Sequence, residues 1–166
     1  MGRYSARRMG PLSYLPRSVL GVAQEIVRHL LKRPVVGVAV AARTEDGRWL
    51  LIRRADTGTW ALPGGTVEWG ETLRTTVVRE LDEEAGVDDV TIGPIVGVFS
   101  RPDRDIRFHA VTIVVSARVA APSRPPKNRL EIREARLFRD EELPAPLAMG
   151  MDDMLAAARR GEVVFE

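Results

Sequence analysis

Three glutamates stand close together in the middle of the chain, within a segment that has a helical pattern. Glu80, Glu83 and Glu84 are spaced at i, i+3 and i+4, which places their carboxylates on one face of a helix. Like charges at this spacing destabilise a helix by about 0.2–0.5 kcal/mol per pair, so the cluster is useful where a divalent cation neutralises it. Mg²⁺ binds carboxylates, water and substrate phosphates together. The alternative is a solvated acidic helix face.

A double glycine, Gly64-Gly65, precedes this helix, and glycine lets a backbone approach a ligand closely. A backbone carbonyl there would be a further oxygen ligand. The chain has no cysteine and two histidines, His29 and His109. These counts exclude disulfides, thiolate metal sites and three-histidine metal sites. A metal ion would therefore need mainly oxygen ligands, which favours hard cations such as Mg²⁺ or Mn²⁺.

Hydrophobic periodicity predicts the elements that must position these residues. The predicted helices are Pro16–Lys32, Thr72–Glu84 with Gly86 as its cap, and Ala148–Arg160 with Gly161 as its stop. The predicted strands are Val35–Ala42, Trp49–Arg53, Val90–Phe99, Ala110–Ala117 and Glu134–Phe138. Strands that alternate with two or three helices indicate a mixed α/β or α+β sandwich.

Charge is distributed unevenly, although the net charge is only +2. Residues 1–34 hold seven basic side chains and one acidic side chain, whereas residues 35–166 hold 18 basic and 22 acidic ones. We therefore expect a basic arm with an amphipathic helix over residues 1–34 and one globular domain over residues 35–166. The arm could contact a polyanion or an acidic surface of a second subunit; the alternative is a solvated surface helix.

The sequence does not predict a membrane-spanning segment. The longest apolar-leaning stretch near the N-terminus, Ser18–Leu31, is interrupted by Gln24, Glu25, Arg28 and His29. An acidic residue inside this stretch also argues against a signal peptide. We therefore expect a cytoplasmic protein without a membrane partner.

The segment from Gly65 to Val87 resembles the signature box of the Nudix hydrolase family. The family pattern is Gly, five residues, Glu, seven residues, Arg-Glu, an aliphatic residue, any residue, Glu-Glu, any residue, Gly and an aliphatic residue. The matching residues, all at the right spacing, are Gly65, Glu71, Arg79, Glu80, Leu81, Glu83, Glu84, Gly86 and Val87. The resemblance implies the family's α/β/α sandwich from about residue 35 onward, with a mixed β-sheet and a catalytic loop–helix–loop.

The resemblance also implies hydrolysis of a phosphoanhydride in a nucleoside diphosphate that is linked to a further group. The family uses Mg²⁺ or Mn²⁺, and the metal ligands carried over to this chain are the Gly64 carbonyl and the carboxylates of Glu80, Glu83 and Glu84. One of the three glutamates would orient or deprotonate the attacking water. The bound cation would neutralise phosphate oxygens and lower the pKa of a bound water.

Further charged residues complete the expected catalytic set. Arg79 would hold the glutamates by ion pairing, and Glu71 would support the geometry of the loop and helix. Glu131 comes just before a predicted strand and is the first candidate for an additional ligand or base; the alternative is a surface glutamate. The expected catalytic residues are therefore Arg79, Glu80, Glu83 and Glu131.

The segment Ser100–His109 resembles the Arg-Asp-Pro-Arg-x-His segment of Nudix enzymes that act on ADP-ribose, with Ile106 in place of the proline. Its arginines could neutralise a diphosphate, and its histidine could reach a sugar hydroxyl; the alternative is a charged hairpin turn. Before the box, an arginine could bind phosphate and a tryptophan could stack on a base or pack under its loop. The candidate substrate-binding residues are Arg54, Trp60, Arg101, Arg107 and His109.

These features favour a Mg²⁺-dependent hydrolase of nucleoside diphosphate sugars, including ADP-ribose, that yields a nucleoside monophosphate and a sugar phosphate. The alternatives are a house-cleaning nucleoside triphosphate pyrophosphatase, an RNA 5′-end pyrophosphohydrolase, and a non-catalytic sensor with a Nudix fold. The expected partners are a small nucleotide substrate and a second copy of the chain. That copy would pack against the amphipathic helix of residues 16–32. Nucleic acid is the less favoured partner because few aromatic residues accompany the basic arm.

Overall fold

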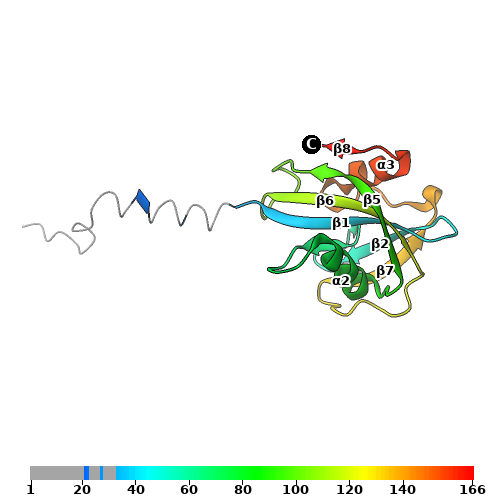
Figure 1. The fold of residues 1–166 in the computed structure, drawn as a ribbon. Helices are drawn as coiled ribbons and strands as arrows, with labels where there is room; N and C mark the ends of the chain where they lie inside the picture. The colour runs from blue at the N-terminus through cyan, green and yellow to red at the C-terminus, as the bar shows by residue number, and fades with distance from the viewer. Residues whose placement is uncertain (1–20, 23–26, 28–32) are drawn as a thin grey trace, which may run out of the picture. The chain divides into compact units, whose positions relative to one another are not determined.

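The computed structural model describes residues 21–22, 27 and 33–166. Contacts divide the chain into two units, Met1–Arg33 and Pro34–Glu166, and the second unit carries the sheet (Figure 1). The predicted helix over residues 16–32 lies outside the described residues, apart from Gly21, Val22 and Val27, which are helical and exposed. Among the described helices, none has the length and apolar character that crossing a bilayer requires.

One mixed sheet forms the centre of the second unit. Its strands are β1 (Val35–Arg43), β2 (Trp49–Arg54), β3 (Trp60–Ala61), β4 (Gly64–Thr66), β5 (Val90–Phe99), β6 (Ala110–Val119), β7 (Ile132–Phe138) and β8 (Val164–Phe165). The order is β3-β2-β1-β6-β5-β8, with β4 paired to β1 and β7 paired to β2. Strands β1 and β6 are parallel, and so are β5 and β8; the other pairs are antiparallel.

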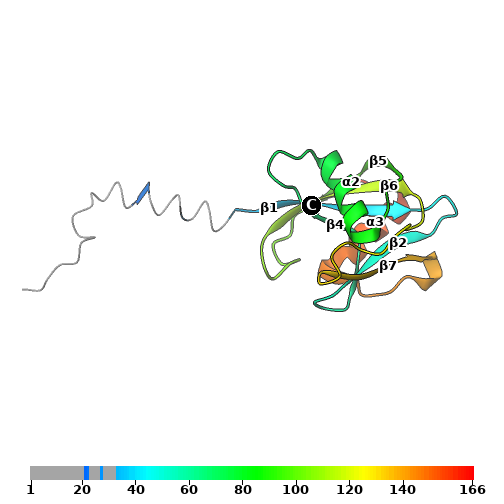
Figure 2. The ribbon, with the colours of Figure 1, turned by 90° about the horizontal axis from the view of Figure 1, so that it is seen from below.

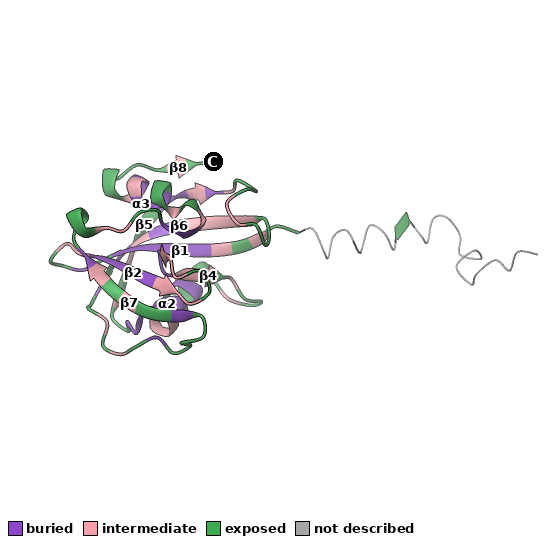
Figure 3. Cartoon of the chain, turned by 180° about the vertical axis from the view of Figure 1, so that it is seen from behind, coloured by how far each residue is buried: buried purple, intermediate pink, exposed green. Residues whose placement is uncertain are grey.

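Two helices cover opposite faces of this sheet (Figures 1 and 2). Helix α2 (Leu73–Ala85) packs Val77 and Leu81 into one core, and helix α3 (Met151–Arg160) packs Leu155 into the other. Alternate residues of β1 point into the two cores, so this strand is buried on both faces (Figure 3). The expected α/β sandwich with a mixed sheet is confirmed.

One edge of β1 pairs with two different strands, β4 near its start and β2 at its end. Strand β4 pairs with β1 at Gly37–Ala39, whereas β2 pairs with it only at Arg43. Strand β2 instead pairs along its length with β7, which begins at Ile132. The start of β1, the end of β2 and the start of β7 therefore surround one space beside β4.

The predicted central helix is confirmed as α2. The Thr72 side chain accepts a hydrogen bond from the backbone N–H of Thr75, and Gly86 ends the helix in the left-handed region at φ 64°. The predicted last helix, Ala148–Arg160, is wrong at its start. Residues 148–150 form a separate 3₁₀ turn, η3, because Met149 and Gly150 have φ of 53° and 63°.

Several strand boundaries also differ from the prediction. Strand β6 continues to Val119, and β7 begins at Ile132 rather than Glu134. The strands β3, β4 and β8 were not predicted, because two or three residues carry no measurable period. A second short 3₁₀ turn, η2, spans Asp140–Glu142.

Candidate active site

The double glycine brings α2 directly against the sheet. A Cβ atom at Gly64 would overlap the backbone of Val38 in β1, and Gly64 has φ of 155°, which disfavours other residues. A Cβ atom at Gly65 would overlap the carboxylate of Glu80 on α2. Gly64 therefore requires glycine, whereas the lack of a side chain at Gly65 makes room for a glutamate of the helix.

Arg79 ties the glutamates to the loop before α2. Its Nε atom donates to Glu71 Oε1 at 2.8 Å, and its Nη1 atom donates to Glu80 Oε1 at 2.8 Å. Glu83 Oε2 lies 3.4 Å from the same Nη1 atom. Hydrogen bonds from Arg79 and Thr76 lower the pKa of Glu71 to about 2, so this carboxylate stays charged. The predicted ion pairing and the loop-supporting contact of Glu71 are both present as contacts.

Glu80 and Glu84 lie in a less polar environment. The Glu84 carboxylate accepts a hydrogen bond from the Gly64 N–H at 2.8 Å. Burial nevertheless raises the pKa of Glu84 to about 8, and the neighbouring Glu80 carboxylate also raises it. Burial likewise raises the pKa of Glu80, against the opposing effect of Arg79. These two carboxylates are charged at low cost only when a cation compensates them.

A cavity of about 510 Å³ opens beside the helix, between β4, the β5–β6 loop and η3. Glu80 and Glu84 line it, together with further acidic and basic side chains. Its charged lining consists of Arg54, Arg104, Arg107, Asp56, Asp105, Glu80, Glu84 and Glu131. Five acidic and three basic side chains line the cavity, so the lining would repel a phosphate anion when all five carboxylates are ionised.

The donor set fits a divalent cation. In the described part of the chain, no three acidic or histidine side chains converge on one point as metal ligands would. Arg79 instead holds Glu80 and Glu83, and the Gly64 N–H holds Glu84. The available ligands are oxygen atoms, and a bound cation would favour the charged forms of the Glu80 and Glu84 carboxylates, which burial disfavours. Hard cations such as Mg²⁺ and Mn²⁺ prefer this chemistry.

The expected metal-ligand and catalytic residues occupy one side of the cavity or the helix next to it. Gly64, Glu80, Glu84 and Glu131 all line the cavity. The carbonyl of Glu131 accepts the Ala55 N–H at 2.7 Å, which fixes this segment beside the end of β2. The lining does not include Glu83, whose side chain is 44% exposed and contacts Arg79.

The expected substrate-binding residues separate into two groups. Arg54 and Arg107 line the cavity, each in a bidentate ion pair, with Asp56 and Asp105 respectively. The lining does not include Trp60, Arg101 or His109. Trp60 packs edge-on against Phe138 with ring centroids 4.8 Å apart, while His109 Nε2 lies 2.8 Å from the Ser100 carbonyl oxygen.

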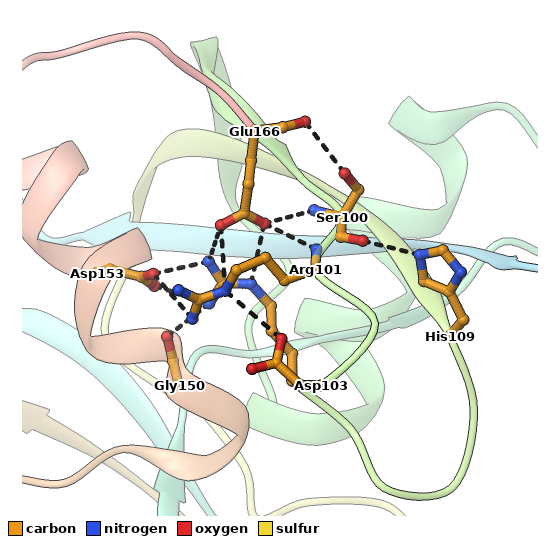
Figure 4. A network of polar contacts seen from close by, with 8 residues as sticks. Ser100, Arg101, Asp103, His109, Gly150, Asp153 and Glu166 are labelled. Atoms are coloured by element: carbon orange, nitrogen blue, oxygen red, sulfur yellow. Dashed lines mark hydrogen bonds and ion pairs between the residues drawn. The ribbon is translucent and has the colours of Figure 1, made fainter.

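Arg104 contacts Gly150, Asp153 and Glu166, which Figure 4 labels, and so it is held within the protein. Its Nη2 atom lies 2.7 Å from Asp153 Oδ2 and 2.6 Å from Glu166 Oε1, and its Nη1 atom donates to the Gly150 carbonyl at 3.0 Å. The expectation that Arg104 neutralises a diphosphate does not match this arrangement, because two carboxylates already neutralise it. Arg104 joins the β5–β6 loop to the start of α3 and to the segment after β8.

Three methionines line the cavity that the sequence did not indicate as functional residues. Met149, Met151 and Met154 line the cavity from η3 and α3. Their spacing lies within a predicted helix, where methionines are read as ordinary core residues. No pattern in the sequence indicates the turn at Met149 that separates η3 from α3.

The structure is thus an α/β sandwich that carries a glycine-containing loop and an acid-rich helix beside a charged cavity. The family model of the NUDIX domain matches residues 32–158. This match covers more than half of the chain, and the chain belongs to the NUDIX family.

Individual relatives agree with this assignment. The chain is 49% identical over 71 residues to a MutT-like protein of Streptomyces ambofaciens, covering 43% of this chain and 46% of that protein. It is 47% identical over 73 residues to an ADP-ribose pyrophosphatase of Methanocaldococcus jannaschii, covering 42% and 43%. The crystal structure of an ADP-ribose pyrophosphatase from Streptococcus suis matches with a TM-score of 0.66 and 25% identity, over 81% of this chain and 100% of that one. The chain thus aligns with less than half of each of these curated relatives.

Proposed function

We propose that this protein is a pyrophosphohydrolase that cleaves nucleoside diphosphate sugars, including ADP-ribose, to a nucleoside monophosphate and a sugar phosphate. The observation that carries the proposal is the cavity itself, where Glu80, Glu84 and Glu131 face the same space as Arg54 and Arg107. Its volume of about 510 Å³ lies within the usual range for small-molecule sites. The similarity to ADP-ribose pyrophosphatases supports this substrate class.

The glutamates of α2 are the proposed metal ligands. Glu80, Glu83, Glu84 and the Gly64 carbonyl would hold Mg²⁺ or Mn²⁺, and Arg79 positions the carboxylates between turnovers. When bound, the cation supplies neutralisation of phosphate oxygens and a lower pKa for a bound water. Glu83 already lies at the exposed end of the Arg79 contacts, so its carboxylate is free to turn toward a ligand.

The chain's own carboxylates would move the proton of the attacking water. In the proposed reaction, the water oxygen forms a bond to one phosphorus atom while the bridging P–O bond breaks. The bridging oxygen leaves with the other phosphate, and the proton passes to a carboxylate. Glu80, Glu83 and Glu131 are the candidates for this base, and Glu131 lines the cavity from the turn immediately before β7.

Arg54 and Arg107 are the proposed phosphate contacts. Each guanidinium holds one carboxylate through two hydrogen bonds, and each retains further N–H donors that can face the cavity. We assign no direct substrate contact to Trp60, Arg101 or His109. Their contacts support the neighbouring loops instead.

We also propose that residues 1–34 and 35–166 are separate parts and that the protein is a homodimer. The division of contacts at Arg33 supports the two separate parts. The basic charge of residues 1–34 and the acidic charge of residues 35–166 support contact between two copies of the chain. Light scattering during size-exclusion chromatography of the full chain measures the mass directly. A mass near 37 kDa, twice the 18.4 kDa of one chain, is expected, and a monomer at micromolar concentration contradicts the dimer.

A substrate panel with Mg²⁺ tests the function. It contains ADP-ribose, GDP-mannose, UDP-glucose, nucleoside triphosphates with 8-oxo-dGTP, and a 5′-triphosphate RNA. Turnover of the sugar conjugates that Glu83→Gln reduces by about 100-fold or more is the expected result. The matched control is Glu45→Gln, an exposed position in the β1–β2 turn, which leaves turnover unchanged.

Other outcomes of the panel would replace the proposal. Pyrophosphate release from nucleoside triphosphates, with sugar conjugates untouched, points to house-cleaning of nucleotides. Turnover of the RNA alone points to 5′-end processing. If nothing is hydrolysed and Glu83→Gln behaves like the unaltered protein, a ligand sensor becomes the better assignment.

A further inference from the structure

One wall of the cavity has a chemistry that hydrolysis itself does not use. Met149, Met151 and Met154 line this wall from η3 and α3, and Phe108 and Leu130 extend it from two loops. Met154 is buried, whereas Leu130 is 90% exposed and Phe108 is 40% exposed. We call these five residues the methionine wall. Its five apolar side chains line the same cavity as the charged groups that are proposed to bind phosphate.

The backbone takes an unfavourable conformation to form this wall. Met149 has φ of 53°, a left-handed value that non-glycine residues adopt rarely. A continuous helix through Ala148 would avoid this strain, and the turn instead brings the Met149 sulfur within 3.7 Å of Arg107 Nη2. Strain of this kind is concentrated at binding sites, where the surrounding structure enforces it. The turn therefore serves to present Met149 beside a proposed phosphate contact.

The wall has few groups that could read the hydrogen-bonding edge of a ligand. In the described part of the chain, no asparagine, glutamine, serine or histidine side chain lines the cavity, and its hydroxyls are those of Thr66 and Thr112. The guanidinium groups of Arg54 and Arg107 each hold a carboxylate, and their remaining N–H donors are the ones proposed to bind phosphate. The side chains of the wall offer no donor or acceptor to the hydroxyl groups of a sugar, whose partners would have to be the carboxylates and threonines elsewhere in the lining. A flat aromatic ring would instead contact thioethers, which adapt to its shape and attract it.

We propose that the methionine wall is the subsite for the nucleobase of the substrate and that it binds purines and pyrimidines with little discrimination. This inference rests on the proposed function and names the part of the substrate that the wall recognises. The base lies against Met149 and Met151, and the phosphates extend from it toward Arg54, Arg107 and the glutamates of α2. The enzyme then selects its substrates by the diphosphate and not by the identity of the base.

Calorimetric titration of the full chain with reaction products tests this subsite without turnover. AMP, GMP, CMP and UMP are titrated in Mg²⁺ buffer, with ribose 5-phosphate as the ligand that lacks only the base. The four nucleotides should bind within about tenfold of one another and each at least about tenfold tighter than ribose 5-phosphate. Equal affinity for ribose 5-phosphate, in competition with AMP for one site, overturns the proposal. A preference for one base of about 100-fold or more overturns the lack of discrimination.

A pair of variants locates the base on the wall. Met149→Gln keeps the length of the side chain and adds a polar group, and we expect nucleotide affinity to fall about fivefold while ribose 5-phosphate binds as before. Met149→Leu keeps an apolar side chain of similar volume and should stay within about twofold. Unchanged nucleotide affinity in Met149→Gln contradicts the assignment to Met149.

The binding and hydrolysis experiments fail in different ways. If all four nucleotides bind more tightly than ribose 5-phosphate but no substrate is hydrolysed, the base subsite stands and the proposed activity is rejected. Hydrolysis of sugar conjugates, with ribose 5-phosphate bound as tightly as AMP, retains the activity and rejects the wall. Thermal unfolding of both Met149 variants verifies that they are folded before binding is compared.

Discussion

Each of two sides of the cavity is held by an arginine, and the two arginines differ in how far away in the sequence their partners lie. On the glutamate side, Arg79 contacts Glu71 and Glu80, eight residues and one residue away in the sequence. On the opposite side, Arg104 contacts Asp153 and Glu166, 49 and 62 residues away. The first network is local, so a short sequence pattern contains it entirely. The second connects three separated segments, and only the folded chain brings them together.

The two networks also differ in what they leave for a ligand. The Arg79 side chain is 23% exposed, and its partners Glu80 and Glu83 are proposed metal ligands that it holds ready. The Arg104 side chain is 6% exposed, and its two carboxylate partners are satisfied within the fold. Glu80 and Glu83 can thus exchange Arg79 for a metal ion, whereas the contacts of Arg104 stabilise the β5–β6 loop. Changes to the first should alter activity, and changes to the second should alter stability.

The largest effect is expected for Gly65→Ala. The added Cβ would overlap the Glu80 carboxylate, so this side chain must move away from its contact with Arg79. A displacement of about 1 Å in a catalytic group can reduce the rate by about 100-fold, and we expect at least that loss in kcat. Steady-state hydrolysis of the best substrate in the panel measures it. The control is Gly21→Ala, where a Cβ would meet no atom within 4 Å. Full activity of Gly65→Ala would show that Glu80 is not held at a required position.

The second effect tests the geometry of the local network. Arg79→Lys keeps the charge but loses the planar fork that reaches Glu71 and Glu80 together. We expect kcat to fall by about 10–100-fold, as for other groups that orient metal ligands. Arg48→Lys is the matched control, since Arg48 pairs with Asp46 at an exposed turn away from the cavity. If Arg79→Lys retains more than half of the activity, a positive charge alone suffices at this position.

The contrast between the networks explains how much of the molecule could be predicted from the sequence. The periods of α2 and of the long strands, with the capping residues Thr72 and Gly86, are local, and the structure confirms them. The contacts that bring Glu80 against Gly65 are encoded within one segment as well. The start of α3 was predicted wrongly, because the left-handed residues Met149 and Gly150 separate η3 from α3 within a segment whose apolar spacing is that of one helix.

The cavity wall shows where prediction from the sequence stops. Arg54 and Arg107 line the cavity from strand and loop ends that lie far apart in the chain, whereas Trp60 packs against Phe138 outside it. Side chains alternate along a strand, so only one of Arg53 and Arg54 can face a ligand, but the sequence does not show which one. The methionine wall has no pattern of its own, because its members come from a loop, a turn and a helix.

The third effect concerns stability and its dependence on pH. Hydrogen bonds from Arg104 lower the pKa of Glu166 to about 2 from its usual 4.5. A carboxylate with a lowered pKa stabilises the fold above its usual value, and the stabilisation is lost as the pH falls from 4.5 toward 2. Glu166→Gln should therefore lower the free energy of unfolding by about 1 kcal/mol at pH 7, after allowance for solvent screening.

Urea unfolding at pH 7 and pH 3 measures this difference. The gap between the unaltered protein and Glu166→Gln should narrow at the lower pH, while activity at pH 7 stays within about threefold. Glu162→Gln removes the exposed pair with Arg160 and should change stability by less than about 0.5 kcal/mol. An equal gap at both pH values would mean that the charge of Glu166 does not contribute to the effect.

The smallest effect is expected for Arg101→Gln, which also decides between two roles for the loop. The Arg101 side chain is 54% exposed, and its contacts with Asp103, Asp153 and Glu166 are 3.5–3.9 Å long. Exposed pairs of this length contribute less than about 0.5 kcal/mol, so stability should hardly change. If Arg101 only adds to the ion pairs that Arg104 makes with Asp153 and Glu166, kcat/KM also stays within about twofold. A rise in KM of about tenfold or more, with kcat unchanged, would instead show that Arg101 turns toward the substrate, as the sequence pattern around residue 104 predicted. Lowering the salt concentration strengthens that distinction, because a phosphate contact made by an exposed arginine weakens with ionic strength and a structural role does not depend on it.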